Sequence, residues 1–311
     1  MLVSSHQGSF MAKIIDGKSL ALSLRENVAE QAADFSDETG IAPTLAVVLI
    51  GEDPASQIYV GRKLAACRKA GINSIEHRLA VDTTQEELLT LIDRLNADDC
   101  VHGILVQLPL PPGLNANELL NRIDPAKDVD GFHPVNVGRL STGTEGLIPC
   151  TPLGCMMLLE TVVEDFRGMQ AVVIGKSNIV GKPVALLLLE RECTVTVTHI
   201  LTRDLDRIVR AADIIVVAAG SPGLVRGSWI KPGAIIIDVG INRITNERGE
   251  TYIVGDACSE ELSHAGAYTP VPGGVGPMTV ACLLSNTMKA ARHQYRALAP
   301  MPVDQEAVSS N

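Results

Sequence analysis

Short runs of β-branched and other apolar residues alternate with helical patterns along almost the whole chain. This alternation is typical of parallel strands, which are buried on both faces and covered by helices. The expected strands are 44–50, 103–107, 171–174, 194–198, 213–218, 234–238 and 252–254. The expected helices are 19–35, 54–70, 85–96, 115–121, 153–164, 183–190 and 278–295. The pattern therefore predicts an α/β protein.

The chain is long enough for two medium-sized domains. Its 311 residues are 46% hydrophobic, which is enough to bury a substantial core. A loop rich in Asp and Gly is expected at 124–146, and the prolines at 149 and 152 indicate a domain boundary. The strands after this boundary have the spacing of a doubly wound, Rossmann-like sheet.

Composition argues against several functions. The formal net charge of −10 leaves no extended phosphate-binding face, so nucleic acid is not an expected partner. No apolar run approaches the roughly 20 residues of a spanning helix, and residues 1–10 lack the segments of a signal peptide. Seven cysteines without a C-x-x-C pair predict neither a disulfide framework nor a zinc site. We therefore expect a cytoplasmic protein that binds neither membrane nor metal.

A glycine-containing turn from Gly175 to Gly181 follows a buried strand and opens a helix. Backbone amides in such a turn, with the helix N-terminus behind them, can hold a pyrophosphate. The turn is not G-x-G-x-x-G, because Ser177 stands where the second glycine is usual, and a purely structural turn is the alternative. A Walker A loop is disfavoured because Gln170 occupies the position that requires its first glycine.

The end of the next strand indicates which dinucleotide is bound. In dinucleotide folds, an acidic residue about 20 residues beyond the first glycine reads the ribose 2′-hydroxyl of NAD. Here the strand end at 197–201 contains no acid, and Lys176 adds a positive charge to the phosphate turn. Both features favour NADP over NAD.

Tyr59 and Lys63 lie four residues apart in a helix that begins after Asp53, so they share one face. A solvated surface pair is the ordinary interpretation of this spacing. Short-chain dehydrogenases also carry Tyr-x-x-x-Lys, but they carry it after their glycine-rich strand. In this chain the pair comes long before that strand, which disfavours that family.

Three further segments concentrate polar or conformationally special residues. Gln107 ends a buried strand, at the carboxyl edge where ligands gather in α/β sheets. Asp128 and Asp130 lie in a turn with Gly131, for which a solvated turn is the alternative. The segment 268–279 contains three prolines and three glycines, a composition that usually shapes a site.

Six motifs, taken in order, resemble those of the bifunctional methylenetetrahydrofolate dehydrogenase/cyclohydrolase family. They are Tyr59-Val60-x-x-Lys63, 106–111, 127–131, 149–152, 175–183 and 269–279, and the resemblance covers residues 12–295. It implies a catalytic domain of 12–149 completed by the helix at 278–296, an NADP-binding domain of 150–277, a folate cleft between them and a homodimer. The tails 1–11 and 297–311 are expected to be disordered.

The resemblance also implies reactions and residue roles. Members oxidise 5,10-methylenetetrahydrofolate to 5,10-methenyltetrahydrofolate with NADP and hydrolyse the product to 10-formyltetrahydrofolate. By resemblance, Lys63 is the catalytic lysine, Gln107 is its partner, Tyr59 stacks on the folate and Asp130 anchors the pterin. A carboxylate suits the paired N–H donors of a pterin, and a tyrosine offers a flat face. The other expected contacts are Gly175, Lys176, Ser177, Ile200 and Ile241 for the cofactor, and Val106, Leu108, Pro270, Pro272 and Gly273 for the folate.

The chain departs from the family pattern near the 2′-phosphate. After His199 the family typically has Ser and then Arg or Lys, whereas this chain has Ile200 and Leu201. Lys176 stands in place of the commoner Arg, which keeps the charge but loses the planar fork. Arg203 is the candidate replacement, and NAD stays open as an alternative cofactor.

Two other functions stay open on the sequence. A non-folate NAD(P)-dependent oxidoreductase, or an NADP-binding module without catalysis, would explain the second half of the chain. Both would leave Tyr59, Lys63, Gln107 and Asp130 without a role. Folate-dependent turnover distinguishes the three functions.

Overall fold

The N-terminal part of the molecule is built on a small parallel sheet. The computed structural model describes residues 12–246 and 248–298. The sheet has the order β3-β2-β4, with β2 at Thr44–Ile50, β3 at Asn73–Leu79 and β4 at Gly103–Val106. Every residue of the central strand β2 is buried, which explains its uninterrupted apolar sequence.

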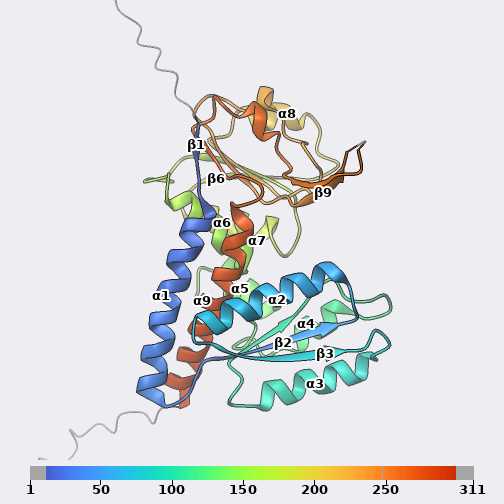
Figure 1. The fold of residues 1–311 in the computed structure, drawn as a ribbon. Coiled ribbons are helices and arrows are strands. Elements are labelled where there is room, and N and C mark those ends of the chain that lie inside the picture. Colours follow the sequence, from blue (N-terminus) through green and yellow to red (C-terminus); the bar gives the residue numbers. More distant parts are fainter. Residues whose placement is uncertain (1–11, 247, 299–311) are drawn as a thin grey trace, which may run out of the picture.

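Helices cover both faces of this sheet (Figure 1). Alternate residues of β2 point to opposite faces. On one face Val47 packs in a cluster with Val60 of α2 (Pro54–Lys69). On the other face Val48 packs with Leu91 of α3 (Gln85–Ala97), beside α4 (Ala116–Arg122). The three layers hold the carboxyl ends of the strands at one edge of the sheet.

The second sheet has six parallel strands in the order β1-β11-β8-β7-β5-β6. Their bounds are β1 Lys13–Ile14, β11 Ala267–Tyr268, β8 Ile235–Asp238, β7 Ile214–Val217, β5 Gln170–Ile174 and β6 Thr194–Thr198. The chain leaves β5 for β6 on one side and then returns to β7 on the other. This reversal of direction is the switch point at which α/β sheets bind ligands.

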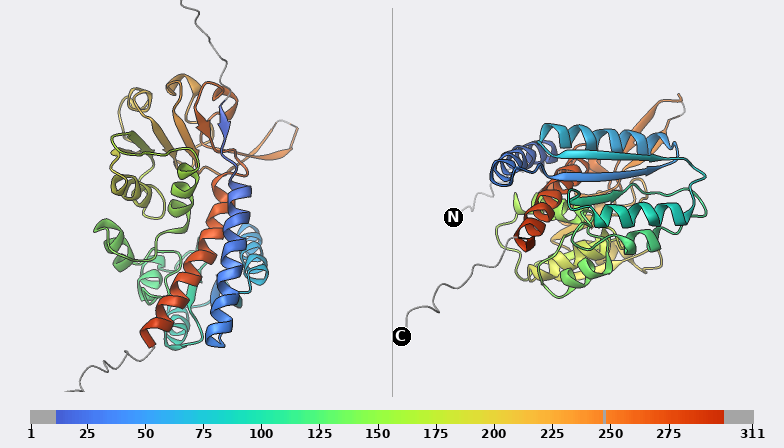
Figure 2. Two further views of the ribbon diagram at one scale, coloured as in Figure 1. Left: turned by 90° about the vertical axis from the view of Figure 1, so that its left-hand side faces the viewer. Right: turned by 90° about the horizontal axis from the view of Figure 1, so that it is seen from below.

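Shorter elements complete this part of the molecule. Helices α7 (Gly181–Glu190) and α8 (Leu205–Arg210) connect strands, and single 3-10 turns lie at Gly227–Trp229 and Ser259–Glu261. The antiparallel hairpin of β9 and β10 stands away from the sheet (Figure 2). Its strands are β9 Asn242–Thr245 and β10 Thr251–Val254.

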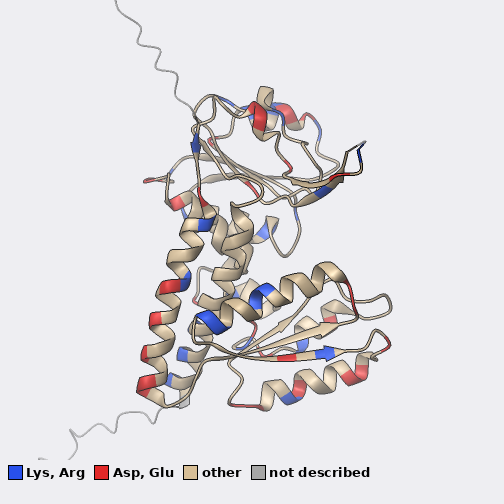
Figure 3. Cartoon of the chain, viewed as in Figure 1, with Lys and Arg blue, Asp and Glu red and all other residues tan. Residues whose placement is uncertain are grey.

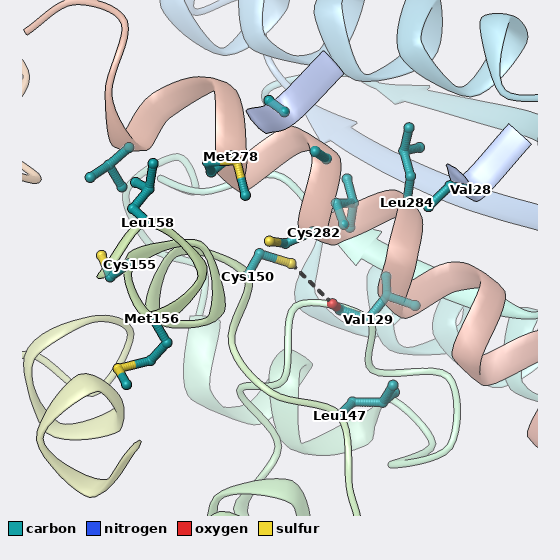
Figure 4. Close-up of a cluster of buried hydrophobic side chains, with 14 of the residues drawn as sticks. Val28, Val129, Leu147, Cys150, Cys155, Met156, Leu158, Met278, Cys282 and Leu284 are labelled. Atoms are coloured by element: carbon teal, nitrogen blue, oxygen red, sulfur yellow. Dashed lines mark hydrogen bonds between the residues drawn. The ribbon is translucent and has the colours of Figure 1, made fainter. Parts of the chain in front are cut away.

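Two long helices join the parts. Helix α1 (Gly17–Thr39) and helix α9 (Val275–Leu298) lie side by side in Figures 1 and 2 and run between the two sheets. Helix α6 (Cys150–Glu160) packs against α9, closely enough that a Cβ at Gly154 would lie 2.8 Å from the Cβ of Met278. Figure 4 shows the apolar side chains between them. The same buried cluster reaches residues of both sheets, so the core is continuous.

Several elements differ from the sequence-based expectation. Residues 13–14, placed by sequence in the catalytic domain, pair instead with β11 in the second sheet, because the Ile15 amide donates to the Tyr268 carbonyl at 2.9 Å. Within the predicted loop 124–146, α5 forms at Pro134–Ser141, because Pro134 suits the first helical position and His133 caps it. Strand β3 was not predicted.

The ends of the chain limit two other expectations. Residues 297–298 continue α9, contrary to the predicted tail from 297. The rest of the predicted tails, 1–11 and 299–311, lies outside the described residues. Within the part of the chain that the structure describes, no helix has the length and apolarity to cross a bilayer.

Candidate active site

A lysine and a glutamine meet above the carboxyl edge of the first sheet. Helix α2 begins after Asp53, whose carboxylate accepts the Ser56 amide at 2.8 Å. Lys63 lies one helical turn after Tyr59, and its Nζ donates to Gln107 Oε1 at 3.0 Å. Gln107 is held in turn, because its Nε2 donates to the Leu108 carbonyl at 2.6 Å and its backbone amide to the Val48 carbonyl at 2.9 Å.

The turn that carries Asp130 is fixed by its neighbours. Lys127 Nζ donates to the carbonyls of Leu95, Asn96 and Asp98 at 2.7–3.1 Å. Buried Asp128 accepts the amides of Phe132 and His133 and Nδ2 of Asn136, at 2.8–3.2 Å. The side chains of Lys127 and Asp128 are thus occupied by hydrogen bonds that hold the turn. Asp130 is left as the carboxylate that is available for a ligand.

The half-buried carboxylate of Asp130 has a raised pKa. Burial raises its pKa to about 6, and the nearby Asp128 carboxylate raises it too. The Lys63 ammonium and the Cys150 thiol, whose Sγ lies 3.9 Å from Asp130 Oδ1, act in the opposite direction. Lys63 therefore shares one electrostatic environment with Asp130, although the two come from distant segments of the chain.

Two residues to which the sequence reasoning gave no site role hold this turn in place. Asn286 of α9 is buried, and its Nδ2 donates to the carbonyls of Val129 and Ile148, both at 2.8 Å. The thiol of Cys150 donates to the Val129 carbonyl at 3.3 Å, as Figure 4 shows. The only sequence signal for Asn286 was a polar residue within an apolar stripe of the last helix.

The proline- and glycine-rich loop forms one wall of a cavity of about 660 Å³. Its other walls come from α1, α2, residues 238–241 and Ile253 of β10. Of the predicted site residues it brings together Tyr59, Ile241, Pro270, Pro272 and Gly273. Tyr59, at 38% exposure, offers its ring to the cavity, and the Arg62 guanidinium carbon lies 6.0 Å from the ring centre.

The remaining predicted residues lie elsewhere. Lys63, Gln107 and Asp130 are not among the residues that line this cavity, and Tyr59 connects it to them along α2. Leu108 is half-buried beside Gln107. Val106 was expected to contact the folate, but its side chain is 2% exposed and packs in the cluster that contains α3. Strand alternation places it on the face away from α2.

The turn after β5 fits a pyrophosphate. Gly175 has φ +116°, and a Cβ there would overlap the Ala218 carbonyl oxygen; one at Gly181 would overlap the Gly175 carbonyl oxygen. Ser177 Oγ accepts the amides of Val180 and Gly181 at 3.2 and 3.3 Å. Among the described residues, the amides of 176–179 donate to no protein acceptor. Free amides beside the N-terminus of α7 suit a pyrophosphate.

Two acidic residues organise the neighbouring strand ends, and the sequence reasoning missed both. Asp238 accepts the amides of Gly240, Asp256 and Ala257 at 2.9–3.0 Å. Asp256 accepts the amides of Ala219 and Gly220 and Nδ2 of Asn242 at 2.7–2.8 Å. Burial raises the pKa of Asp238 to about 6 despite these donors. Ile241, which follows the end of β8 by three residues, is exposed and lines the cavity.

The turn after β6 exposes two apolar side chains where the family pattern has polar ones. Ile200 is 98% exposed and Leu201 80% exposed. The Leu201 amide donates to His199 Nδ1 at 3.2 Å and the His199 amide to Thr202 Oγ1 at 2.9 Å, which fixes the turn. Two adjacent apolar side chains exposed to this degree are unusual, and they follow β6, near the region where the adenosine end of a dinucleotide lies in such folds.

Fold and site define an α/β enzyme that uses a nicotinamide dinucleotide and has a lysine–carboxylate site beside its first sheet. Residues 15–130 match the family described as Tetrahydrofolate dehydrogenase/cyclohydrolase, catalytic domain. Residues 149–295 match the NAD(P)-binding domain of the same family. The chain belongs to this family.

Curated relatives and solved structures agree with this assignment. The chain is 69% identical over 287 residues to Bifunctional protein FolD 1 of Rhizorhabdus wittichii, covering 92% of this chain and 97% of that protein. It is 60% identical over 284 residues to Bifunctional protein FolD of Sphingobium chlorophenolicum, with 91% and 90% covered. The bifunctional enzyme FolD of Campylobacter jejuni superposes with a TM-score of 0.87 at 50% identity, with 91% and 99% covered.

A further solved structure bears on the cofactor. The Trypanosoma brucei enzyme complexed with NADP and an inhibitor has a TM-score of 0.88 at 40% identity, with 92% of this chain and 99% of that chain covered. The predictions of the family, of the two-domain α/β fold class, of the dehydrogenase and cyclohydrolase activities on tetrahydrofolate derivatives and of NADP as cofactor are confirmed. The non-folate alternative is not supported.

Proposed function

We propose that Lys63, Gln107, Tyr59 and Asp130 carry both folate reactions of this enzyme. The observation that carries the proposal is the 3.0 Å contact between Lys63 Nζ and Gln107 Oε1, in a site whose Lys63 charge also acts on Asp130. Both groups that move protons and groups that hold the pterin thus lie at one edge of the sheet. The free side of the Asp130 carboxylate accepts the paired N–H donors of the pterin.

In the first reaction, the contribution of these residues is position. Asp130 fixes the pterin, the Tyr59 ring stacks on the aromatic system, and Pro270, Pro272 and Gly273 form the surrounding wall. Half-buried Leu108, beside Gln107, borders the pterin. NADP, when it is bound, supplies the acceptor for the hydride of the methylene carbon. Because the reacting carbon needs no proton transfer in this step, orientation is the main requirement.

In the second reaction, water adds to the methenyl carbon and loses a proton. The bond between that carbon and the ring nitrogen then breaks; the nitrogen gains a proton and the added hydroxyl loses one to become the formyl carbonyl. Lys63 is the group that moves these protons, and Gln107 holds its Nζ in place without adding a charge. Asp130 keeps the pterin in register during both steps. Asp130 and Tyr59 therefore serve both reactions, whereas Lys63 and Gln107 act in the second.

NADP would be held by the turn after β5 and by residues at the neighbouring strand ends. Gly175 and Ser177 shape the turn, the amides of 176–179 face the pyrophosphate, and Lys176 supplies the positive charge. Ile241 borders the cofactor at the end of β8, and Ile200 borders it after β6. The 2′-phosphate has Lys176 and Arg203 as its cationic candidates.

The proposed organisation also includes a catalytic unit of 12–149 with 278–296, of which β1 adds to the second sheet, and a dinucleotide unit of 150–277. It further includes a homodimer and a cytoplasmic location without nucleic acid or membrane. The net charge of −10 supports the absence of nucleic acid, and seven free cysteines suit a reducing compartment. The exposed Tyr252 on the β9–β10 hairpin supports a second copy as its cover. Light scattering of the wild-type chain and of Tyr252→Lys tests the dimer.

The variant Lys63→Ala tests the residue roles. It should abolish methenyltetrahydrofolate hydrolysis and leave folate binding largely intact, because Asp130 and Tyr59 stay in place. Arg68→Ala, on the opposite face of α2, is the matched control and should keep wild-type rates. Hydrolysis is followed by the loss of methenyl absorbance and binding by calorimetry. Strong hydrolysis by Lys63→Ala would refute the assigned role.

A further inference from the structure

Asp256 is a carboxylate buried beside the carboxyl ends of β7 and β8. The acidic residues of α1 and α3 are exposed, and Figure 3 shows them along these helices. Asp256, in contrast, has no exposed surface, and within residues 12–246 and 248–298 it forms no ion pair. Burying a charge without a counter-ion costs free energy, so packing alone does not explain a carboxylate at this position.

The carboxylate of Asp256 joins two loops that follow neighbouring strands. Its Oδ2 accepts the amides of Ala219 and Gly220, which follow β7, at 2.7 and 2.8 Å. Its Oδ1 accepts Nδ2 of Asn242 at 2.8 Å, and Asn242 ends the loop that follows β8. Each oxygen therefore holds one loop, and β7 and β8 are neighbours in the second sheet.

Glycines let these loops approach the buried acids closely. A Cβ at Gly240 would overlap the carboxyl group of Asp256, and a Cβ at Gly255 would overlap that of Asp238. Asp238 Oδ1 in turn accepts the Asp256 amide at 3.0 Å. Because each carboxylate lies directly against backbone, a change at Asp256 is passed to the loops rather than absorbed by side chains.

The loop after β7 also contacts the turn that is proposed to hold the pyrophosphate. A Cβ at Gly175 would overlap the carbonyl oxygen of Ala218, which precedes the two amides that Asp256 accepts. A dinucleotide crosses the crevice at the switch point, with its pyrophosphate at the first strand-to-helix turn. Its adenosine half lies on the β6 side, so its nicotinamide half lies over the loops after β7 and β8.

We propose that Asp256 is a positioning residue that holds the loops after β7 and β8 around the nicotinamide half of NADP. The proposal rests on the proposed binding of the pyrophosphate at 175–181. Asp256 acts through the backbone of the two loops, because three protein donors already occupy its oxygens. Hydride transfer depends on orientation, so the dehydrogenase reaction needs this carboxylate. Hydrolysis of the methenyl product uses no cofactor and does not need it.

The variant Asp256→Asn tests this role by equilibrium binding. A side-chain amide has one acceptor oxygen, so it cannot hold both loops. Calorimetry should show about tenfold weaker binding of NADP⁺, because hydrogen bonds to a charged acceptor are lost. Binding of 2′-phosphoadenosine 5′-diphosphate, which lacks the nicotinamide half, should be unchanged. Hydrolysis of methenyltetrahydrofolate without cofactor reports whether the variant is folded.

Asn242→Asp supplies a second variant at a half-buried position, and a rescue. Alone, it opposes two carboxylates at hydrogen-bond distance and should also weaken NADP⁺ binding. Combined with Asp256→Asn, it lets the new amide nitrogen donate to the new carboxylate and leaves the amide oxygen for the loop after β7, so most of the affinity should return. If Asp256→Asn does not fold, Asn242→Asp alone decides.

Asp213→Asn is the matched control. Asp213 precedes β7 at the opposite edge of the same sheet, and its Oδ2 accepts the Gln170 amide at 2.8 Å. It therefore binds backbone in the same way as Asp256 but far from the carboxyl ends of the strands. Its replacement should leave the affinity for NADP⁺ unchanged, whereas an equal loss in both variants would make the effect of Asp256 a general loss of stability and overturn the proposal.

Two further results would overturn the proposal: wild-type affinity for NADP⁺ in Asp256→Asn, or an equal loss for the ligand without nicotinamide. Lys176→Gln tests the proposed pyrophosphate turn separately and should weaken both ligands. If Lys176→Gln weakens both and Asp256→Asn neither, only the positioning role is refuted. If Lys176→Gln changes neither, the proposed pyrophosphate site fails, and the positioning role fails with it.

Discussion

Replacing Asn286 by leucine should loosen the turn that carries Asp130. The side chain keeps its number of heavy atoms and its branching at Cγ but loses the two 2.8 Å hydrogen bonds to the carbonyls of Val129 and Ile148. Val129 keeps the Cys150 thiol as a donor, whereas no other donor to the Ile148 carbonyl is found among the described residues. Two lost hydrogen bonds at about 1 kcal/mol each, and one buried carbonyl left unpaired, lower the free energy of unfolding by about 3 kcal/mol.

Urea denaturation measures this loss, and the matched control is Ser285→Ala. Ser285 precedes Asn286 in α9 and is partly buried, and its removal should change the free energy of unfolding by less than about 0.5 kcal/mol. Because Asp130 follows Val129, Asn286→Leu should also raise the KM for folate more than it lowers kcat. A change of less than about 1 kcal/mol, with KM unaltered, would refute the idea that α9 positions the pterin anchor.

Three further predictions concern titration, backbone and cofactor. Burial raises the pKa of Asp130 to about 6, so the unfolded chain loses this proton first as pH rises, and stability falls from about pH 4 to about pH 6. In Asp130→Asn the midpoint of urea unfolding should change less between these pH values than in the wild-type chain. An equal change in both proteins would contradict the prediction. Gly181→Ala should lower the free energy of unfolding by about 3 kcal/mol or more, measured by thermal unfolding. Gly138→Ala, where the added Cβ meets open space on α5, should not destabilise the chain. Equal melting temperatures of the two variants would show that the turn at Gly181 can move to accept a Cβ. Leu201→Arg should lower the KM for NADP⁺ about tenfold and leave the KM for NAD⁺ unchanged, because it adds a charged donor beside the 2′-phosphate. Steady-state kinetics with both cofactors test this, and an equal change of the two KM values would refute it.

The sequence was informative where structure depends on local chemistry. The uninterrupted apolar run at 44–50 gave the bounds of β2, because a central parallel strand is buried on both faces. The strand-to-helix turn at Gly175 was also found, because a positive φ and a close approach demand glycine. The structure then brings Lys63 to Gln107, two residues that the family motifs had paired and that lie 44 positions apart in the chain.

Features that depend on tertiary contacts could not be predicted. Strand β3 is polar along much of its length, because it lies at an edge and is only partly buried, so no apolar run marked it. The side chain of Val106, expected at the folate wall, instead packs in the cluster that contains α3, because neighbouring residues of a strand point to opposite faces. Asn286 and Asp256 act through carbonyls and amides far away in sequence, and no spacing rule reports such contacts.

The pairing of β1 with β11 sets an order of events during synthesis. Lys13 is made early, but its partner Ala267 leaves the ribosome about 250 residues later, which at 5–20 residues per second takes tens of seconds. Until then β1 has no neighbour and α1 lacks α9, which is made last of all the described elements. The first sheet can assemble early, whereas the edge of the second sheet and the Asp130 turn are completed only when translation is almost over. The nascent chain therefore acquires its active site at the end.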